Sequence, residues 1–187
     1  LSPFLLLPAV AWMATNAARA ILLTTVPVAL TAYFSYVWSL VAATGPFSVT
    51  IPWAPSLGLS LSFHFDGLSA LFAVLISGIG GLIVPYASAY LAATPFAGRF
   101  YVSLFAFMGS MLGIVLSDNV LMLFVFWELT GFTSYLLIGF DHERPEARRA
   151  ATQALIVTGG GGLALLAAGI LMLQSGGTPQ LSELAAQ

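Results

Sequence analysis

Long stretches of this sequence carry no charged side chain, and that absence limits the possible folds more than any other feature. Asp, Glu, Lys and Arg are all missing from residues 20–65, 67–98, 100–117 and 150–182. Only 6% of the 187 residues are charged, whereas a soluble domain carries about a quarter. A chain this poor in charge cannot cover its surface in water. Lipid removes that requirement, so the sequence predicts an integral membrane protein.

Six apolar runs approach or exceed the length of about 20 residues that a membrane-spanning helix needs. They cover residues 1–15, 20–44, 66–94, 99–117, 118–140 and 145–174. The first run is short and the sequence begins with Leu1, so we expect a truncated first helix in a fragment of a longer protein. We expect the third helix to kink at Pro85. The predicted fold class is an all-α integral membrane protein with about six transmembrane helices.

Residues 45–65, between the second and third runs, have a different pattern. From Leu57 onward, apolar side chains alternate strictly with small or polar ones, which is the period of a β-strand. The pattern predicts a small β-hairpin outside the hydrocarbon. Asp66 is expected to cap the next helix, and Thr178-Pro179 to open a short interfacial helix through Leu184. We therefore divide the chain into two helices (1–44), the hairpin (45–65), a core of helices three to six (66–174) and a closing loop with the start of a short helix (175–187).

The placement of the arginines predicts the orientation in the membrane. With six spans, all five arginines fall on one side, which the positive-inside rule makes cytoplasmic. They are Arg19, Arg99, Arg144, Arg148 and Arg149. The hairpin, Asp66, Asp118 and Glu183 then fall on the extracytoplasmic side.

Glu128 is the one ionisable residue well inside a predicted span. At 1.5 Å per residue it lies about 15 Å from Asp118, near the middle of a hydrocarbon core about 30 Å thick. A lone carboxylate there costs ~2.5–3.5 kcal/mol on insertion scales. Its proton affinity is therefore sensitive to any nearby charge, which suits a proton relay. The structural alternative is a protonated carboxyl group that hydrogen-bonds to a neighbouring helix.

Several other residues are candidates for supporting roles. Tyr135 and Gly131 share the helix stripe of Glu128, and Gly131 leaves room for a close neighbour or a water molecule. Four hydroxyl side chains either line a wet path or hydrogen-bond back to their own helix. They are Thr130, Thr133, Ser134 and Thr158. Asp66 is a helix cap or a relay group, and Arg148 and Arg149 are supporting cations at the membrane face.

Other features of the sequence exclude several classes of site. The chain has no cysteine, which excludes disulfides, thiolate metal sites and a catalytic thiol. The glycine run 159–162 lacks the lysine of a phosphate loop, so we interpret it, like the Gly109-x-x-x-Gly113 pair, as close helix packing. The acidic turn 141–146 is interpreted as a solvated helix start rather than a metal site, and His64 as structural rather than gating. The net charge of −2 offers no basic footprint for nucleic acid. We predict neither a metal nor a cofactor.

Three stretches of the sequence resemble one family of membrane proteins. They are residues 63–69 (FHFDGLS), 117–130 (SDNVLMLFVFWELT) and 139–149 (GFDHERPEARR). They resemble the N-terminal region of the large A-type subunits of Mrp-type multisubunit Na+/H+ antiporters, which are similar to the antiporter-like proton-pumping subunits of respiratory complex I. The Trp-Glu-Leu-Thr element at 127–130 is shared across the wider superfamily, whereas the turn at 142–149 favours Mrp.

The resemblance implies a role for Glu128. In the family, the matching glutamate pairs with a lysine on a broken seventh helix, which lies beyond the 187 residues, so we do not expect this piece to transport alone. The resemblance also implies a transporter subunit, not an enzyme. Such a subunit works with other membrane subunits in a prokaryotic plasma membrane. The complex exchanges cytoplasmic Na+ for external H+ and so regulates pH. The alternatives are a subunit of complex I or of a membrane-bound hydrogenase, and a non-transporting scaffold or assembly subunit.

Overall fold

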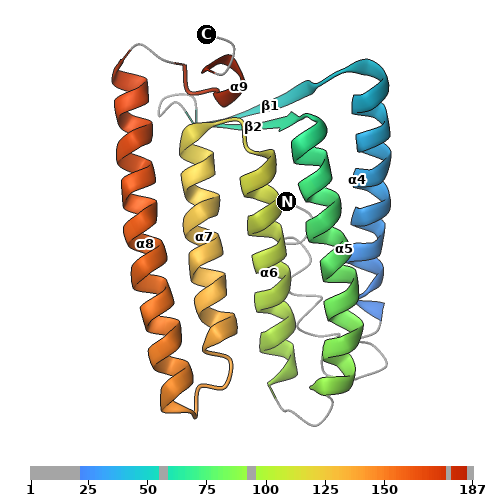
Figure 1. The fold of residues 1–187 in the computed structure, drawn as a ribbon, viewed down its shortest axis with the longest axis vertical. Helices are drawn as coiled ribbons and strands as arrows, with labels where there is room; N and C mark the ends of the chain where they lie inside the picture. Colours follow the sequence, from blue (N-terminus) through green and yellow to red (C-terminus); the bar gives the residue numbers. More distant parts are fainter. Residues whose placement is uncertain (1–21, 55–58, 92–95, 176–177, 185–187) are drawn as a thin grey trace.

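The computed structural model describes residues 22–54, 59–91, 96–175 and 178–184, and in this part of the chain five long helices stand side by side beneath a small hairpin (Figure 1). The elements are α4 (Thr25–Thr44), β1 (Phe47–Ala54), β2 (Leu59–Phe65), α5 (Gly67–Tyr90), α6 (Ala97–Leu116), α7 (Val120–Ile138), α8 (Pro145–Gln174) and α9 (Leu181–Leu184). Each of the five long helices is long and apolar enough to cross a membrane. The predicted fold class is confirmed, while the first predicted run, 1–15, lies outside the described residues.

Side-chain caps mark the starts of two of the helices, α5 and α7. The carboxylate of Asp66 accepts the N–H of Ser69 at 2.7 Å, and the Asp66 N–H donates to the Ser69 hydroxyl at 2.9 Å, which is a reciprocal capping box. The predicted cap is therefore confirmed. The side chain of Asn119 accepts two N–H groups of the first turn of α7, at 2.9 and 3.2 Å, so that helix begins at Val120. Pro85 lies inside α5, which continues past it to its end.

The predicted hairpin is present as two antiparallel strands that pair from Phe47 with Phe65 towards the turn. Two polar contacts connect the strands on the same face. The hydroxyl of Ser48 lies 2.8 Å from Nδ1 of His64, and the hydroxyl of Thr50 lies 2.8 Å from that of Ser62. His64 therefore has a structural contact within the sheet. The interpretation of the period-two pattern as a strand is confirmed by this pairing.

The link between α6 and α7 ties the hairpin to α9. The N–H of Asp118 donates to the carbonyl oxygen of Ser62 at 2.8 Å. The carboxylate of Asp118, whose side chain is 3% exposed, accepts both the N–H and the hydroxyl of Ser182 at 2.8 Å. Helix α9 begins at Leu181, so the predicted start at Thr178-Pro179 is wrong. The reason is that the carboxylate binding the first turn of α9 comes from Asp118, far away in the sequence.

The helices differ strongly in how much of their surface the bundle covers. Helix α6 is the most enclosed, with Tyr101 and Phe105 only 1% exposed. Helix α8 stands at the edge of the row and is the least enclosed, with Ile156 and Val157 more than two-thirds exposed (Figure 1). The buried residues of α8 are Ala151, Gly162 and Gly169. This helix therefore contacts the bundle through a narrow stripe of small residues, and its apolar outer side suits lipid or another membrane chain.

Candidate functional site

Glu128 lies near the middle of α7, between Val120 and Ile138. At 1.5 Å per residue it is about 12 Å from the start of the helix and about 15 Å from its end. Its Oε1 atom is buried and has no hydrogen-bond partner among the described residues. A buried polar atom without a partner is rare in native structures and indicates strain, an absent partner or function.

The carboxyl group of Glu128 is directed against the backbone of α8. A Cβ atom added to Gly162 would overlap Oε1 of Glu128 and would lie 3.0 Å from its Cδ atom and 3.1 Å from Cδ1 of Trp127. The side chain of Glu128 therefore occupies the space that any residue other than glycine would fill at position 162. The interpretation of the glycine run as close packing agrees with this contact, but the sequence alone did not indicate that the packed group is the carboxyl group.

The same kind of contact repeats along the antiparallel pair α7 and α8. In each case the side chain of one helix fits against a glycine of the other. The pairs, in order along the chain from the start of α7, are Val120 with Gly169, Glu128 with Gly162, Thr158 with Gly131, and Ala151 with Gly139, the residue that directly follows α7. The residue numbers of the contacts rise along α7 while those of their partners fall along α8, as expected for an antiparallel pair. These small residues therefore hold the two helices in one register. Among these four pairs, Glu128 is the one ionisable member.

The hydroxyl groups near Glu128 are engaged with their own helices. Thr130 donates to the carbonyl oxygen of Phe126 at 2.9 Å, Thr133 to that of Leu129 at 2.7 Å, and Thr158 to that of Ala154 at 2.9 Å. Bonding back to the helix was one of the two expected uses of these groups. A hydroxyl oxygen that donates one bond can still accept another, so the relay hypothesis for these groups stays a prediction. Ser134 and Tyr135 are half-buried on the same helix, beyond Glu128.

Each described arginine lies at a helix end, far from Glu128. At 1.5 Å per residue, the axial distance from Arg149 to Gly162, where the carboxyl group lies, is about 20 Å. Arg148 donates to the carbonyl oxygens of His142 and Glu143, at 2.6 and 3.3 Å, and so holds the turn before α8. A cationic partner for Glu128 is therefore not available among the described residues.

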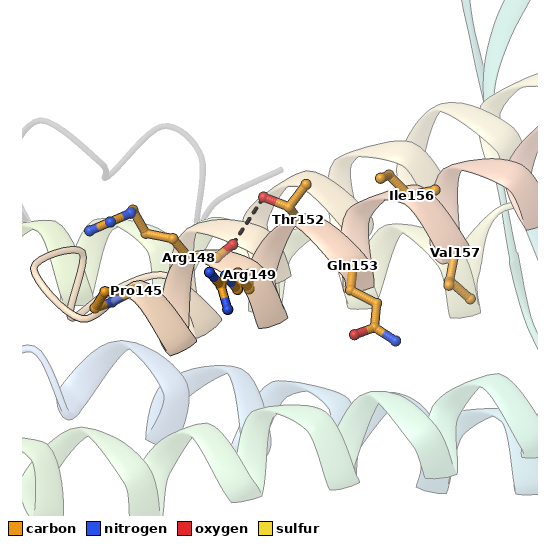
Figure 2. Close-up of a pocket in the computed structure, with 7 residues that line it drawn as sticks. All are labelled: Pro145, Arg148, Arg149, Thr152, Gln153, Ile156 and Val157. Carbon is orange, nitrogen blue, oxygen red and sulfur yellow. Dashed lines mark hydrogen bonds between the residues drawn. The ribbon is translucent and has the colours of Figure 1, made fainter.

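Arg148 and Arg149 line a groove on α8 that begins at the helix start (Figure 2). The groove is lined by Pro145, Arg148, Arg149, Thr152, Gln153, Ile156 and Val157. Its composition changes from cationic to polar to apolar over three turns. That order is expected for a helix that passes from a membrane face into hydrocarbon, with arginine at the interface.

Asp66 lies at the other end of the bundle, close to the hairpin. Burial raises the pKa of Asp66, but its hydrogen bonds with Ser69 and the nearby His64 together hold the pKa below its ordinary value of 3.8. A cleft beside it is also lined by Asp118 and Ser182. The structure therefore separates the predicted site residues: Glu128 lies mid-bundle, the two arginines lie at one end, and Asp66 lies at the other. Asp118, which the sequence indicated only as a helix end, emerges as a buried structural carboxylate.

The ranges of the chain that match known protein families include the three stretches on which the resemblance rests. Two family models match the chain. One is described as "NADH:quinone oxidoreductase/Mrp antiporter, TM" and matches residues 117–187, and the other is described as "NADH-Ubiquinone oxidoreductase (complex I), chain 5 N-terminus" and matches residues 51–101. The chain is 44% identical, over 161 residues, to a Na+/H+ antiporter A1 subunit of Staphylococcus haemolyticus, covering 86% of this chain and 20% of that protein. The chain belongs to the antiporter-like family of membrane subunits. The predicted family is therefore confirmed.

Another curated relative and two solved structures are also similar to this chain. An antiporter A1 subunit of Staphylococcus aureus is 50% identical over 124 residues, which is 66% of this chain and 15% of that protein. A chain in the structure of the Mrp complex from Dietzia sp. DQ12-45-1b is 32% identical and has a TM-score of 0.75, covering 97% of this chain and 20% of that one. A chain of an archaeal membrane-bound sulfane sulfur reductase has a TM-score of 0.76 at 18% identity, covering 98% of this chain and 37% of that one, and shares the fold. The chain thus spans about a fifth of the length of the antiporter subunits.

Proposed function

We propose that this chain forms the proton-relay portion of a multisubunit Na+/H+ antiporter, with Glu128 as the group that accepts and releases the proton. The observation that carries the proposal is the buried Oε1 atom in the middle of α7, which has no hydrogen-bond partner among the described residues. If the carboxyl group were only a structural link between helices, we would expect that atom to be bonded to a neighbour. Its lack of a described partner favours a relay over a structural link.

The cost of the charged form of Glu128 in the membrane can be compared with the attraction that a nearby cation would provide. The charged form costs ~2.5–3.5 kcal/mol at mid-membrane on insertion scales. A unit positive charge about 4 Å away contributes about 4 kcal/mol of attraction at an effective dielectric constant of 20. The two energies are similar in size, so one nearby cation would offset the cost of the charged form of Glu128. That cation has to come from outside the described residues.

The orientation and partners follow from the arginines and from the relatives. The described arginines lie near the starts of α6 and α8, at the end of the bundle opposite the hairpin (Figure 1). The positive-inside rule makes that end cytoplasmic and the hairpin extracytoplasmic. The relatives include a chain of an Mrp complex, so we propose that other membrane subunits are the partners. We further propose that the complex resides in a prokaryotic plasma membrane and exchanges cytoplasmic Na+ for external H+.

The test replaces Glu128 in the complete antiporter complex. Glu128→Gln keeps the size and removes the titratable proton, and we expect it to abolish Na+-dependent proton flux. Flux is followed with a pH-sensitive dye in everted membrane vesicles from a host that lacks its own Na+/H+ antiporters. Native gel electrophoresis of the same membranes measures assembly of the complex, which we expect to stay at the wild-type level.

The matched control is Glu146→Gln, the same chemical change at an exposed residue in the first turn of α8. We expect this variant to transport at the wild-type rate. Unchanged flux in Glu128→Gln, with the complex assembled, would refute the relay. Full activity of Glu128→Gln together with lost assembly in Glu128→Leu would instead support the scaffold function.

The second candidate is a proton-translocating subunit of a redox-driven complex. It is favoured by the match of residues 51–101 to a complex I family model. The 44% identity to an antiporter A1 subunit favours the antiporter over this candidate. Purification of the complete complex distinguishes them, because flavin or iron–sulfur subunits would accompany the chain only in the redox-driven complex.

A further inference from the structure

We propose that Gly162 is a positioning residue that sets the location of the Glu128 carboxyl group and, through it, the rate and pH dependence of proton exchange. This inference rests on the relay function proposed above. Its basis is the contact in which the carboxyl group occupies the space of a missing side chain, so that a Cβ atom at position 162 would overlap Oε1. Gly162 itself is buried, whereas its neighbour Gly161 is exposed.

The surroundings of Gly162 leave the carboxyl group as the part that has to move. The atoms nearest to an added Cβ are Oε1 and Cδ of Glu128, and then Cδ1 of Trp127 at 3.1 Å. Oε1 and Cδ are at the far end of a flexible side chain, whereas the backbone of α8 is held by the contacts of Gly131 and Gly169 on either side. Alanine at position 162 is therefore expected to displace the carboxyl group and to leave the helix pair in place.

The neighbouring glycines offer a control within the same helix turn. A Cβ atom at Gly159, Gly160 or Gly161 would meet no atom within 4 Å among the described residues. Alanine also forms helices more readily than glycine, by about 1 kcal/mol. Gly161→Ala thus makes the same chemical change as Gly162→Ala, one residue away, without touching the carboxyl group.

The experiment compares Gly162→Ala and Gly161→Ala in the complete antiporter complex. We expect Gly162→Ala to assemble normally but to lose proton flux by roughly tenfold or more, since misplacement of a reacting group by about 1 Å can cost a hundredfold. We also expect its profile of flux against pH to shift. Gly161→Ala should match the wild type in both respects. The same variants are then compared in the Glu128→Asp background. There the carboxyl group is one methylene shorter and is expected to end short of position 162, so Gly162→Ala should change the flux less than twofold.

A chemical readout tests the position of the carboxyl group independently of transport. Dicyclohexylcarbodiimide modifies protonated carboxyl groups inside membranes, and mass spectrometry of the peptide containing Glu128 gives the rate. We expect this rate to differ severalfold between Gly162→Ala and the wild type, and to be unchanged in Gly161→Ala.

Two results would overturn the inference. One is an unchanged labelling rate in Gly162→Ala, and the other is a loss of flux from Gly162→Ala that is equally large with and without the Glu128→Asp change. If Glu128→Asp alone has no flux, the labelling rate decides. Normal flux in Glu128→Gln would refute the relay itself, while the labelling rate would still report whether Gly162 positions the carboxyl group.

Discussion

Replacement of Gly113 by alanine should destabilise the protein through a single aromatic ring. Gly113 lies on α6, and a Cβ atom there would overlap the ring of Phe126 on α7. That ring is 5% exposed, so it has little space into which it can move. Adding a methylene-sized group to a packed core costs about 1–3 kcal/mol. We expect Gly113→Ala to lower the free energy of unfolding by that amount relative to Gly78→Ala on α5, which gains the same helix propensity, because either the ring or the two helices must shift.

The free energy is measured by titrating the purified complete protein with sodium dodecyl sulfate in mixed micelles and following its helical circular dichroism. Gly78→Ala on α5 is the matched control, since a Cβ atom there meets nothing within 4 Å among the described residues. A double-mutant cycle with Phe126→Ala identifies the ring as the cause, because alanine lacks the Cγ, Cδ1 and Cε1 atoms that overlap. We expect a coupling energy of about 1–3 kcal/mol in favour of the double variant. If Gly113→Ala were as stable as Gly78→Ala, or if the effects of Gly113→Ala and the change at Phe126 were additive, this contact would not limit the approach of α6 and α7.

Further changes at Ser182 and Asp66 test the end of the bundle that carries the hairpin. Ser182→Ala removes the hydroxyl that donates to the buried carboxylate of Asp118, and leaving such an oxygen unpaired costs about 1–3 kcal/mol. Hydrogen exchange in α9 should therefore accelerate, and exchange at the wild-type rate would contradict this. Asp66→Ala should cost about 0.5–2 kcal/mol by removing the cap of α5. Because the pKa of Asp66 is lower when folded than its ordinary 3.8, its charged form stabilises the fold above that pH. The difference in melting temperature between the wild type and Asp66→Asn should shrink as the pH falls through the folded pKa, and a difference independent of pH would refute this.

Those parts of the fold that depend on local pattern could be predicted from the sequence. The run 145–174 was predicted with the bounds that α8 has, because an arginine-rich turn and a proline mark its start and polar residues follow its end. The cap at Asp66 and the strand period before it also depend on neighbours in the sequence, and both were confirmed. The boundaries of α6 and α7 were displaced by only a few residues, since apolar composition changes gradually at a membrane face.

Contacts between residues distant in the sequence were the ones that the pattern did not reveal. The start of α9 was wrong because its first turn binds the carboxylate of Asp118, which no local signal connects to Ser182. The glycine run 159–162 was interpreted as packing, but only Gly162 makes a close contact, because a Cβ atom at the other three glycines would meet no atom within 4 Å among the described residues. Which of the four meets Glu128 depends on the register of α7 against α8. That register follows from pairs of small residues spread over both helices, and one sequence does not indicate how they align.

Two of the close contacts of α7, those of Phe126 and Glu128, together explain how a flexible glutamate can be held at one place in the bundle. Phe126 and Glu128 are two residues apart, so at about 100° per residue they point to nearly opposite sides of the helix. Phe126 fits against Gly113 of α6 on one side, and Glu128 fits against Gly162 of α8 on the other. A rotation of α7 would break both contacts at once. The aromatic ring therefore fixes the direction in which the carboxyl group points, and Gly162 fixes how far it reaches, so a change at either glycine should alter the labelling rate of Glu128.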